Sequence, residues 1–296
     1  MSINLHARPG LLLTMIVILF SACDKIVDKL PDESTLCSVQ MITSPAQNPT
    51  EIGPTDTIRF SYDSHGDPVS IIRLETGTEL NDYIFWYDHE HRLTDVIGTF
   101  GPGANEGDGF DTWQKLYYRN GRIILDTTFQ FGTIHGTRPI PFLPMDSSFL
   151  IRQITDYAYD PEGRISRTRD TVPNGFVQIN LYSYDNRGNL IKILESAYAS
   201  QNIFPHDTVT FLYSGFDNKT NPNRTNPVWQ FLDRNYSLNM QRPADKYNEV
   251  GLPTAFSGSS APSSMLHPLP FAFLNLFPST ISYSCEYPGT PGGHHY

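Results

Sequence analysis

The run His89-Glu90-His91 contains residue types that bind transition metals. Zinc sites in proteins draw on at least three protein ligands, and helical metalloprotease sites space their two histidines four residues apart. Here the histidines are two residues apart, in a segment whose pattern predicts a hairpin turn, and no third ligand is evident beside them. The spacing therefore favours a solvated turn, and we expect neither a bound metal nor a cofactor.

Residues 101–111 are rich in glycine and polar side chains, which superficially resembles a dinucleotide-binding loop. The glycine spacing is wrong for that function, and no strand-to-helix unit surrounds the segment. Calcium binding through oxygen atoms of Asn105, Glu106, Asp108 and Asp111 is a second interpretation. A hairpin loop without a ligand is the favoured one.

Catalytic patterns are weak along this chain. There is no Gly-x-Ser-x-Gly nucleophile motif, and the aspartates that recur at predicted turns invite comparison with the paired carboxylates of glycosidases. Each of these aspartates already has a structural role in its turn. We therefore predict no catalytic residue and favour a non-enzymatic role.

Aromatic residues make up 12% of the sequence and offer a different chemistry. Trp86 and Trp113 lie near long predicted loops, where indole rings could stack against sugar rings. Aromatic side chains of half-exposed sheets also form cross-strand pairs or core contacts, so this alternative stays open.

The elements that would position these side chains are β-hairpins that repeat along the chain. In one of these units, Tyr184-Asp185 ends one strand and Gly188 follows three residues after the aspartate; the unit at Tyr159-Asp160 and Gly163 matches the pattern most cleanly. The carboxylate can accept hydrogen bonds from the turn backbone, and glycine can adopt a positive φ without steric cost. In the second unit His91 stands where glycine is expected. The predicted turn residues are Asp63, Gly66, Asp88, Asp160, Gly163, Asp185 and Gly188.

These units resemble YD repeats, the Tyr-Asp-x-x-Gly hairpins of Rhs-type shells and of a group of bacterial lipoproteins of uncharacterised function. The resemblance covers roughly residues 37–287, and residues 217–222 (Asp-Asn-Lys-Thr-Asn-Pro) are similar to a signature of that lipoprotein group. The dyads are unevenly spaced, and the chain is too short for a shell that encloses cargo. We expect an all-β domain of successive antiparallel β-hairpins that form a twisted or partly closed sheet.

Long C-terminal loops are expected to cover this sheet. Residues 265–278 are too apolar to remain in water, and residues 228–235, which follow Asn226-Pro227, could form a short helix. Residues 288–296 are expected to form a loose tail. The single β domain therefore spans residues 37–287.

The N-terminal residues are predicted to be a targeting signal and not part of the folded domain. Residues 11–20 have the length and apolar character of a signal peptide, and Leu19-Phe20-Ser21-Ala22-Cys23 resembles a bacterial lipobox. The resemblance implies removal of residues 1–22, acylation of Cys23 and a flexible tether over residues 23–36. It places the protein in the bacterial cell envelope, lipid-anchored at the outer membrane on its periplasmic or surface face. An ordinary secretory signal with a chance cysteine is the alternative.

Two cysteines remain, Cys37 and Cys285, near the two ends of the predicted domain. In an oxidising compartment such a pair is a candidate disulfide, and two buried thiols are the alternative.

Charge and composition limit the classes of binding partner that we expect. The net charge of −10 leaves no basic patch for nucleic acid, so none is expected as a partner. The leading hypothesis is a membrane-anchored lipoprotein with a non-catalytic binding or structural role, whose ligand is a glycan or another envelope protein. The alternatives are an envelope polysaccharide hydrolase and a lipid-binding or assembly-factor lipoprotein. The sequence gives no indication of oligomeric state.

Overall fold

The described part of the chain in this computed structural model comprises residues 37–44, 56–74, 82–99, 107–136, 138–141, 151–199, 205–241, 243–257, 279–285 and 294–295. All of them belong to the unit Glu33–Tyr296. The predicted signal peptide, Cys23, the tether and the apolar loop at 265–278 lie outside the described residues. No helix among the described residues has the length and apolar character needed to cross a bilayer.

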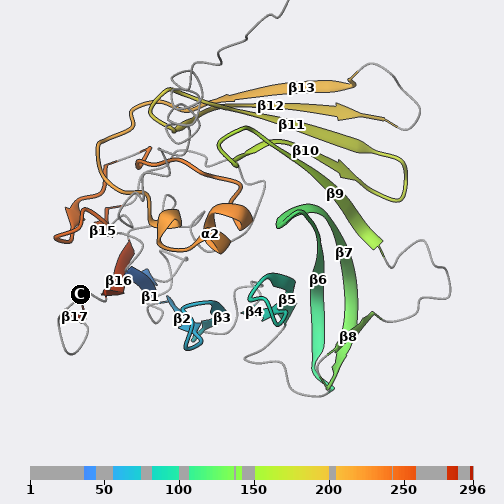
Figure 1. Cartoon of the computed structure of the whole chain (residues 1–296), viewed down its shortest axis with the longest axis horizontal. Helices are drawn as coiled ribbons and strands as arrows, with labels where there is room; N and C mark the ends of the chain where they lie inside the picture. The colour runs from blue at the N-terminus through green and yellow to red at the C-terminus, as the bar shows by residue number, and fades with distance from the viewer. Residues whose placement is uncertain are drawn as a thin grey trace, which may run out of the picture. The chain divides into compact units, whose positions relative to one another are not determined.

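The described residues form one antiparallel β-sheet with very little helix (Figure 1). The predicted all-β fold of successive hairpins in a twisted sheet is confirmed. The first strands are β1 (Cys37–Ser44), β2 (Asp56–Tyr62), β3 (Pro68–Arg73), β4 (Asp82–Tyr87), β5 (Leu93–Thr99), β6 (Gly109–Arg119) and β7 (Arg122–His135). They are followed by β8 (Arg138–Pro141), β9 (Ile151–Tyr159), β10 (Ile165–Thr171), β11 (Val177–Tyr184), β12 (Leu190–Tyr198) and β13 (Asp207–Leu212). The C-terminal elements are η3 (Pro222–Thr225), α2 (Pro227–Leu232), β14 (Lys246–Tyr247), β15 (Pro253–Phe256), β16 (Ser279–Cys285) and β17 (His294–His295).

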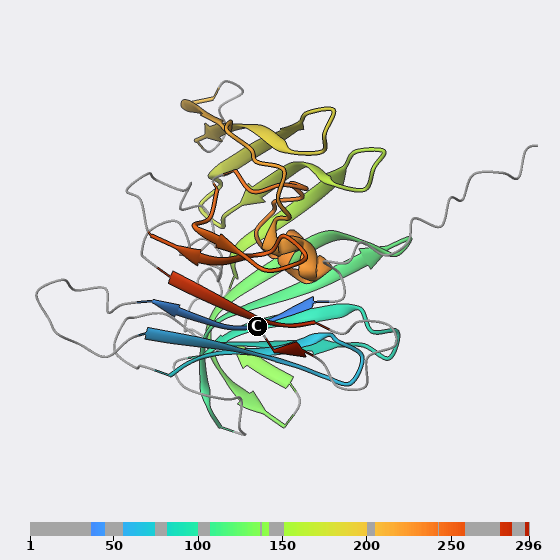
Figure 2. The same cartoon turned by 90° about the vertical axis from the view of Figure 1, so that its left-hand side faces the viewer.

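Strand order follows the sequence over most of the sheet. Each strand from β1 to β7 pairs with the next, β7 pairs with both β8 and β9, and the ladder continues to β13. On the other side of β1 lies β16, followed by β15 and β14 (Figure 2). The first described strand is thus paired with a strand from the C-terminal region. Two residues of the predicted tail, in β17, pair with the end of β16.

The pairing of β1 with β16 places Cys37 directly opposite Cys285. Their sulfur atoms are joined by a disulfide with an S–S distance of 2.08 Å. Both cysteines are fully buried. The covalent link therefore joins the beginning of the described domain to its last long strand.

A shift of register beside the turn bends most hairpins. The shift falls between Ser61 and Tyr62 in one hairpin and between Ser183 and Tyr184 in another. Such bulges increase the local right-handed twist of a sheet. Repetition of the same irregularity at successive hairpins accounts for the curl of the ladder seen in Figure 1.

A short C-terminal segment fills the concave side of this curl. Asn226 caps α2 by accepting a hydrogen bond from the Val228 N–H, and Pro227 at the first helical position needs no N–H partner. The helix overlaps residues 228–235, which were predicted to form a short helix, and carries the buried side chains of Trp229, Phe231 and Leu232.

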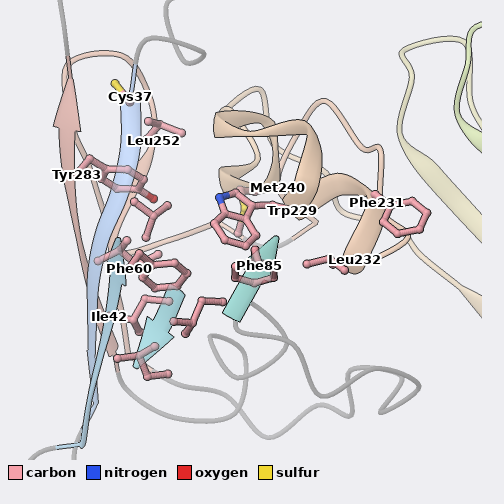
Figure 3. Packing of buried hydrophobic residues seen from close by; sticks show 14 of the residues in the cluster. Cys37, Ile42, Phe60, Phe85, Trp229, Phe231, Leu232, Met240, Leu252 and Tyr283 are labelled. Carbon is pink, nitrogen blue, oxygen red and sulfur yellow. The ribbon is translucent and has the colours of Figure 1, made fainter. Parts of the chain in front are cut away.

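These helical side chains pack against residues from well-separated strands of the ladder. The ring of Trp229 lies 5.6 Å from that of Phe60 in β2 and 5.7 Å from that of Phe85 in β4, both edge to face (Figure 3). The Phe231 ring lies 5.2 Å from that of Tyr157 in β9. The helix therefore forms the centre of a core that strands far apart in the sheet share.

Candidate functional site

The aspartate turns have one common geometry. In the first, Oδ1 of Asp63 accepts hydrogen bonds from the backbone N–H groups of His65 (2.8 Å) and Asp67 (3.0 Å). Gly66 follows with φ of +82°. Asp88 and Asp185 accept the equivalent pair of bonds, Asp160 accepts the one from Arg164, and Gly163 and Gly188 have φ of +85° and +82°. Each turn aspartate is thus engaged by its own backbone, as expected for a structural residue.

The tyrosine near the end of the first strand of each of five hairpins, which in four of them directly precedes the turn aspartate, has a role that sequence reasoning missed. Its hydroxyl donates to a backbone carbonyl of an earlier part of the sheet, so each hairpin is tied to its predecessor. The pairs are Tyr62 to Val39 (2.9 Å), Tyr87 to Pro68 (2.8 Å), Tyr118 to Leu93 (2.8 Å), Tyr159 to Ile123 (2.8 Å) and Tyr184 to Ile165 (3.2 Å). Burial raises the pKa of Tyr118 and of Tyr159 to about 12, which keeps these hydroxyls protonated and able to donate at neutral pH.

Two neighbouring turns bring metal-binding residue types together. Strands β3 and β4 are paired, so the turn after β2 lies beside the turn after β4. One ligand atom each of Asp63, His65 and His91 lies within 4.8 Å of the others. The third ligand that was not evident along the sequence near His91 therefore comes from the preceding hairpin. His89, by contrast, is not part of this cluster. Among the described residues its ion-pair contact is with Glu90, at 3.8 Å.

Trp86 and Trp113 lie on one face of the sheet. Asp95 is the cross-strand partner of both Trp86 and Lys115, and Trp113 is opposite Phe129. The indole Nε1 of Trp113 donates to Asp95 Oδ1 at 2.7 Å, and its ring stacks on that of Phe129 at 4.7 Å.

Both indoles are partly exposed and pack against a small second cluster of buried residues, Ile97, Phe110 and Ile134. The Trp113 indole is therefore held in place by Asp95 and Phe129 in advance of any ligand. Lys115 Nζ lies 5.7 Å from the Trp113 ring centroid. The patch therefore combines apolar rings with one carboxylate and one ammonium group.

A buried polar network lies on the opposite, concave face. Asp170 accepts hydrogen bonds from Thr155 Oγ1 at 2.8 Å and Gln153 Nε2 at 3.0 Å, and it forms a buried ion pair with Arg234 at 3.3 Å. Next to it the Tyr157 hydroxyl donates to Asp126. Burial raises the pKa of Asp126. The other members are Thr168 and Asn180.

Sequence reasoning also missed this network. The sequence did contain a signal for it, because polar residues occupy inward-facing positions of β7, β9 and β10. The ion-pair partner of Asp170, however, is Arg234, which lies 64 residues later in the chain. Because Asp170 is held by Arg234 and its neighbours, and Asp126 by Tyr157, these carboxylates have the partners of a structural network rather than open access to a substrate.

Burial also affects one carboxylate beside α2. It raises the pKa of Asp233 to about 7, against a smaller opposing effect of its hydrogen bond with Asn223. Of the other predicted sites, the calcium interpretation rests partly on Asn105 and Glu106, which lie outside the described residues. The lipidation site, Cys23, lies outside them too.

No protein-family model and no curated protein matches this chain. Among solved structures, a crystal structure of TcdB2-TccC3-Cdc42 is 14% identical with a TM-score of 0.21, covering 67% of this chain and 12% of that one. TcdB2-TccC3 without its hypervariable C-terminal region is 13% identical with a TM-score of 0.22, covering 82% and 13%.

A third similar structure is a Tc holotoxin pore from Photorhabdus luminescens, 14% identical with a TM-score of 0.19, covering 81% of this chain and 13% of that one. This chain thus spans only 12–13% of the length of these proteins. At such values the likeness carries no argument about activity or partners.

Proposed function

We propose that this chain is a lipid-anchored, YD-repeat-like protein of the bacterial cell envelope, with a non-catalytic role in binding a glycan or another envelope protein. The ligand surface in this proposal is the outer patch around Trp86 and Trp113. The anchor is Cys23, on the evidence of the lipobox-like sequence that precedes it.

The observation that supports a binding role most strongly is the filled concave face. Trp229 is only 1% exposed beneath β2 and β4, and Arg234 is 5% exposed against β10. Carbohydrate hydrolases place two carboxylates in an accessible cleft. Here the protein's own C-terminal segment occupies the middle of the concave face, so the outer face is the better surface for a ligand.

The outer patch also has suitable chemistry. Sugar rings present apolar C–H faces beside hydroxyl groups, and an indole ring with nearby polar groups matches both. The hydrogen bond to Asp95 and the stacking on Phe129 hold Trp113 in one orientation, which lowers the entropy lost on binding. Asp95 and Lys115 could exchange hydrogen bonds with ligand hydroxyl groups.

The binding surface is tested by Trp86→Ala and Trp113→Ala variants on a panel of envelope glycans and envelope proteins. We expect each variant to weaken binding by about tenfold or more, which corresponds to ~1.4 kcal/mol. Leu181→Ala is the matched control, since Leu181 is an exposed apolar side chain on β11, away from the patch. Unchanged affinity in both tryptophan variants, with the fold retained by circular dichroism, would exclude this surface.

The anchor is tested separately by Cys23→Ser. In cells that process lipoproteins, the wild-type chain should sediment with membranes, and the variant should lose that association because no acyl chain can be attached. Membrane and soluble fractions are compared by immunoblot. Equal membrane association of the two proteins would contradict acyl anchoring at Cys23.

A further inference from the structure

The tips of the first two hairpins bring together two imidazoles and a carboxylate at the surface. We propose that Asp63, His65 and His91 form a binding site for a divalent transition-metal ion of the Zn²⁺ class. The ligand atoms of the three residues lie within 4.8 Å of one another, a separation that a shared ion could bridge with small side-chain movements. The two imidazole rings are already in contact, with centroids 4.0 Å apart.

The backbone of its own turn orients the Asp63 carboxylate for a role as a metal ligand. The backbone N–H groups of His65 and Asp67 bind Oδ1, while Oδ2 lies 3.6 Å from His65 Nδ1. The backbone hydrogen bonds thus hold one oxygen of the carboxylate in the turn, and the other oxygen lies toward the histidines.

The backbone at His91 supplies an independent observation. His91 has φ of +58°, a left-handed conformation that the equivalent Gly66, Gly163 and Gly188 adopt without a steric cost. A non-glycine residue at such a position costs about 1–2 kcal/mol. A histidine with a strained backbone conformation, whose ring lies 4.0 Å from that of His65, points to a role for the imidazole itself.

Asp67 has the position of a residue that orients a metal ligand. Its Oδ2 lies 3.2 Å from His91 Nδ1. Metal-bound histidines commonly place their second ring nitrogen against a carboxylate, which fixes the tautomer and the orientation of the ring. We assign Asp67 this positioning role.

The donor set selects the type of ion. Two imidazoles with one carboxylate suit Zn²⁺, Cu²⁺ or Ni²⁺, whereas Ca²⁺ and Mg²⁺ require more oxygen ligands. With three protein ligands at the surface, the remaining coordination position would be open to water or to a donor from a partner.

The test is isothermal titration calorimetry of the full chain in detergent, stripped with a chelator and titrated with ZnCl₂. His91→Gly is the most informative variant because glycine suits the backbone of this turn and should leave the fold intact or stabilise it. We expect His91→Gly and His65→Ala to abolish one class of Zn²⁺ sites. Asp67→Asn should weaken the same class by about 10-fold.

His89→Ala is the matched control, because His89 is an exposed histidine of the same turn that is not among the three clustered residues. It should retain the wild-type stoichiometry and affinity, and CaCl₂ should give no comparable binding. The proposal is overturned if His91→Gly binds as many Zn²⁺ ions as the wild type with the same affinity. It is overturned equally if His89→Ala loses the same sites as His91→Gly.

Discussion

Replacing Trp229 with alanine should lower the free energy of unfolding by ~3–5 kcal/mol. The indole is 1% exposed and makes edge-to-face contacts with Phe60, Tyr62 and Phe85, so its removal leaves a cavity where α2 meets β2 and β4. Urea unfolding followed by far-ultraviolet circular dichroism measures the loss. Because this helix joins distant strands, a lower denaturant slope would also show that the sheet no longer unfolds as one unit.

Leu212→Ala is the control for this experiment. Leu212 is 74% exposed on β13, and removal of its side chain should change stability by less than ~0.5 kcal/mol. If Trp229→Ala were no more destabilising than Leu212→Ala, α2 could not be the centre of the core.

A second large effect is expected for Arg234→Met. The substitution keeps an apolar stem of similar length but leaves the Asp170 carboxylate buried without its ion-pair partner, which should cost ~3–5 kcal/mol. If the network holds the C-terminal segment on β10, hydrogen exchange of the backbone around Arg234 should also be faster in the variant than in the wild type.

The matched control is Arg169→Met on the same strand as Asp170. Arg169 forms an exposed pair with Asp156 at 3.9 Å, and such pairs contribute less than ~1 kcal/mol. Adding Asp170→Asn to Arg234→Met should recover part of the lost stability, since the unpaired charge is then removed. Equal losses for Arg234→Met and Arg169→Met would mean that the buried pair does not hold the segment.

Sequence reasoning succeeded where the interactions are local. Asp185 and Gly188 define a turn through bonds made within five residues, and the aromatic residues at Phe60 and Phe85 alternate inward along their strands. Those rules predicted the hairpins and the all-β class. Two adjacent residues, Asn226 and Pro227, likewise predicted the short helix that follows them.

Sequence reasoning was incomplete at the candidate sites because their parts come from different hairpins. His91 was interpreted with its own turn, whereas Asp63 and His65, whose ligand atoms lie within 4.8 Å of its own, belong to the previous turn. The environment of Trp113 likewise depends on Asp95 and Phe129, which two neighbouring strands supply.

The amino-acid sequence by itself determined the turns, the strands and their alternation, since each depends on backbone conformation and on contacts over a few residues. Only the tertiary structure decided which surface is filled and which is open. Asn226 reaches the turn carbonyl of Gly66 across 160 residues, and Arg234 reaches Asp170 across 64. No local sequence pattern encodes these pairings. They form only when the bulged hairpins curl far enough for the C-terminal segment to contact several of them.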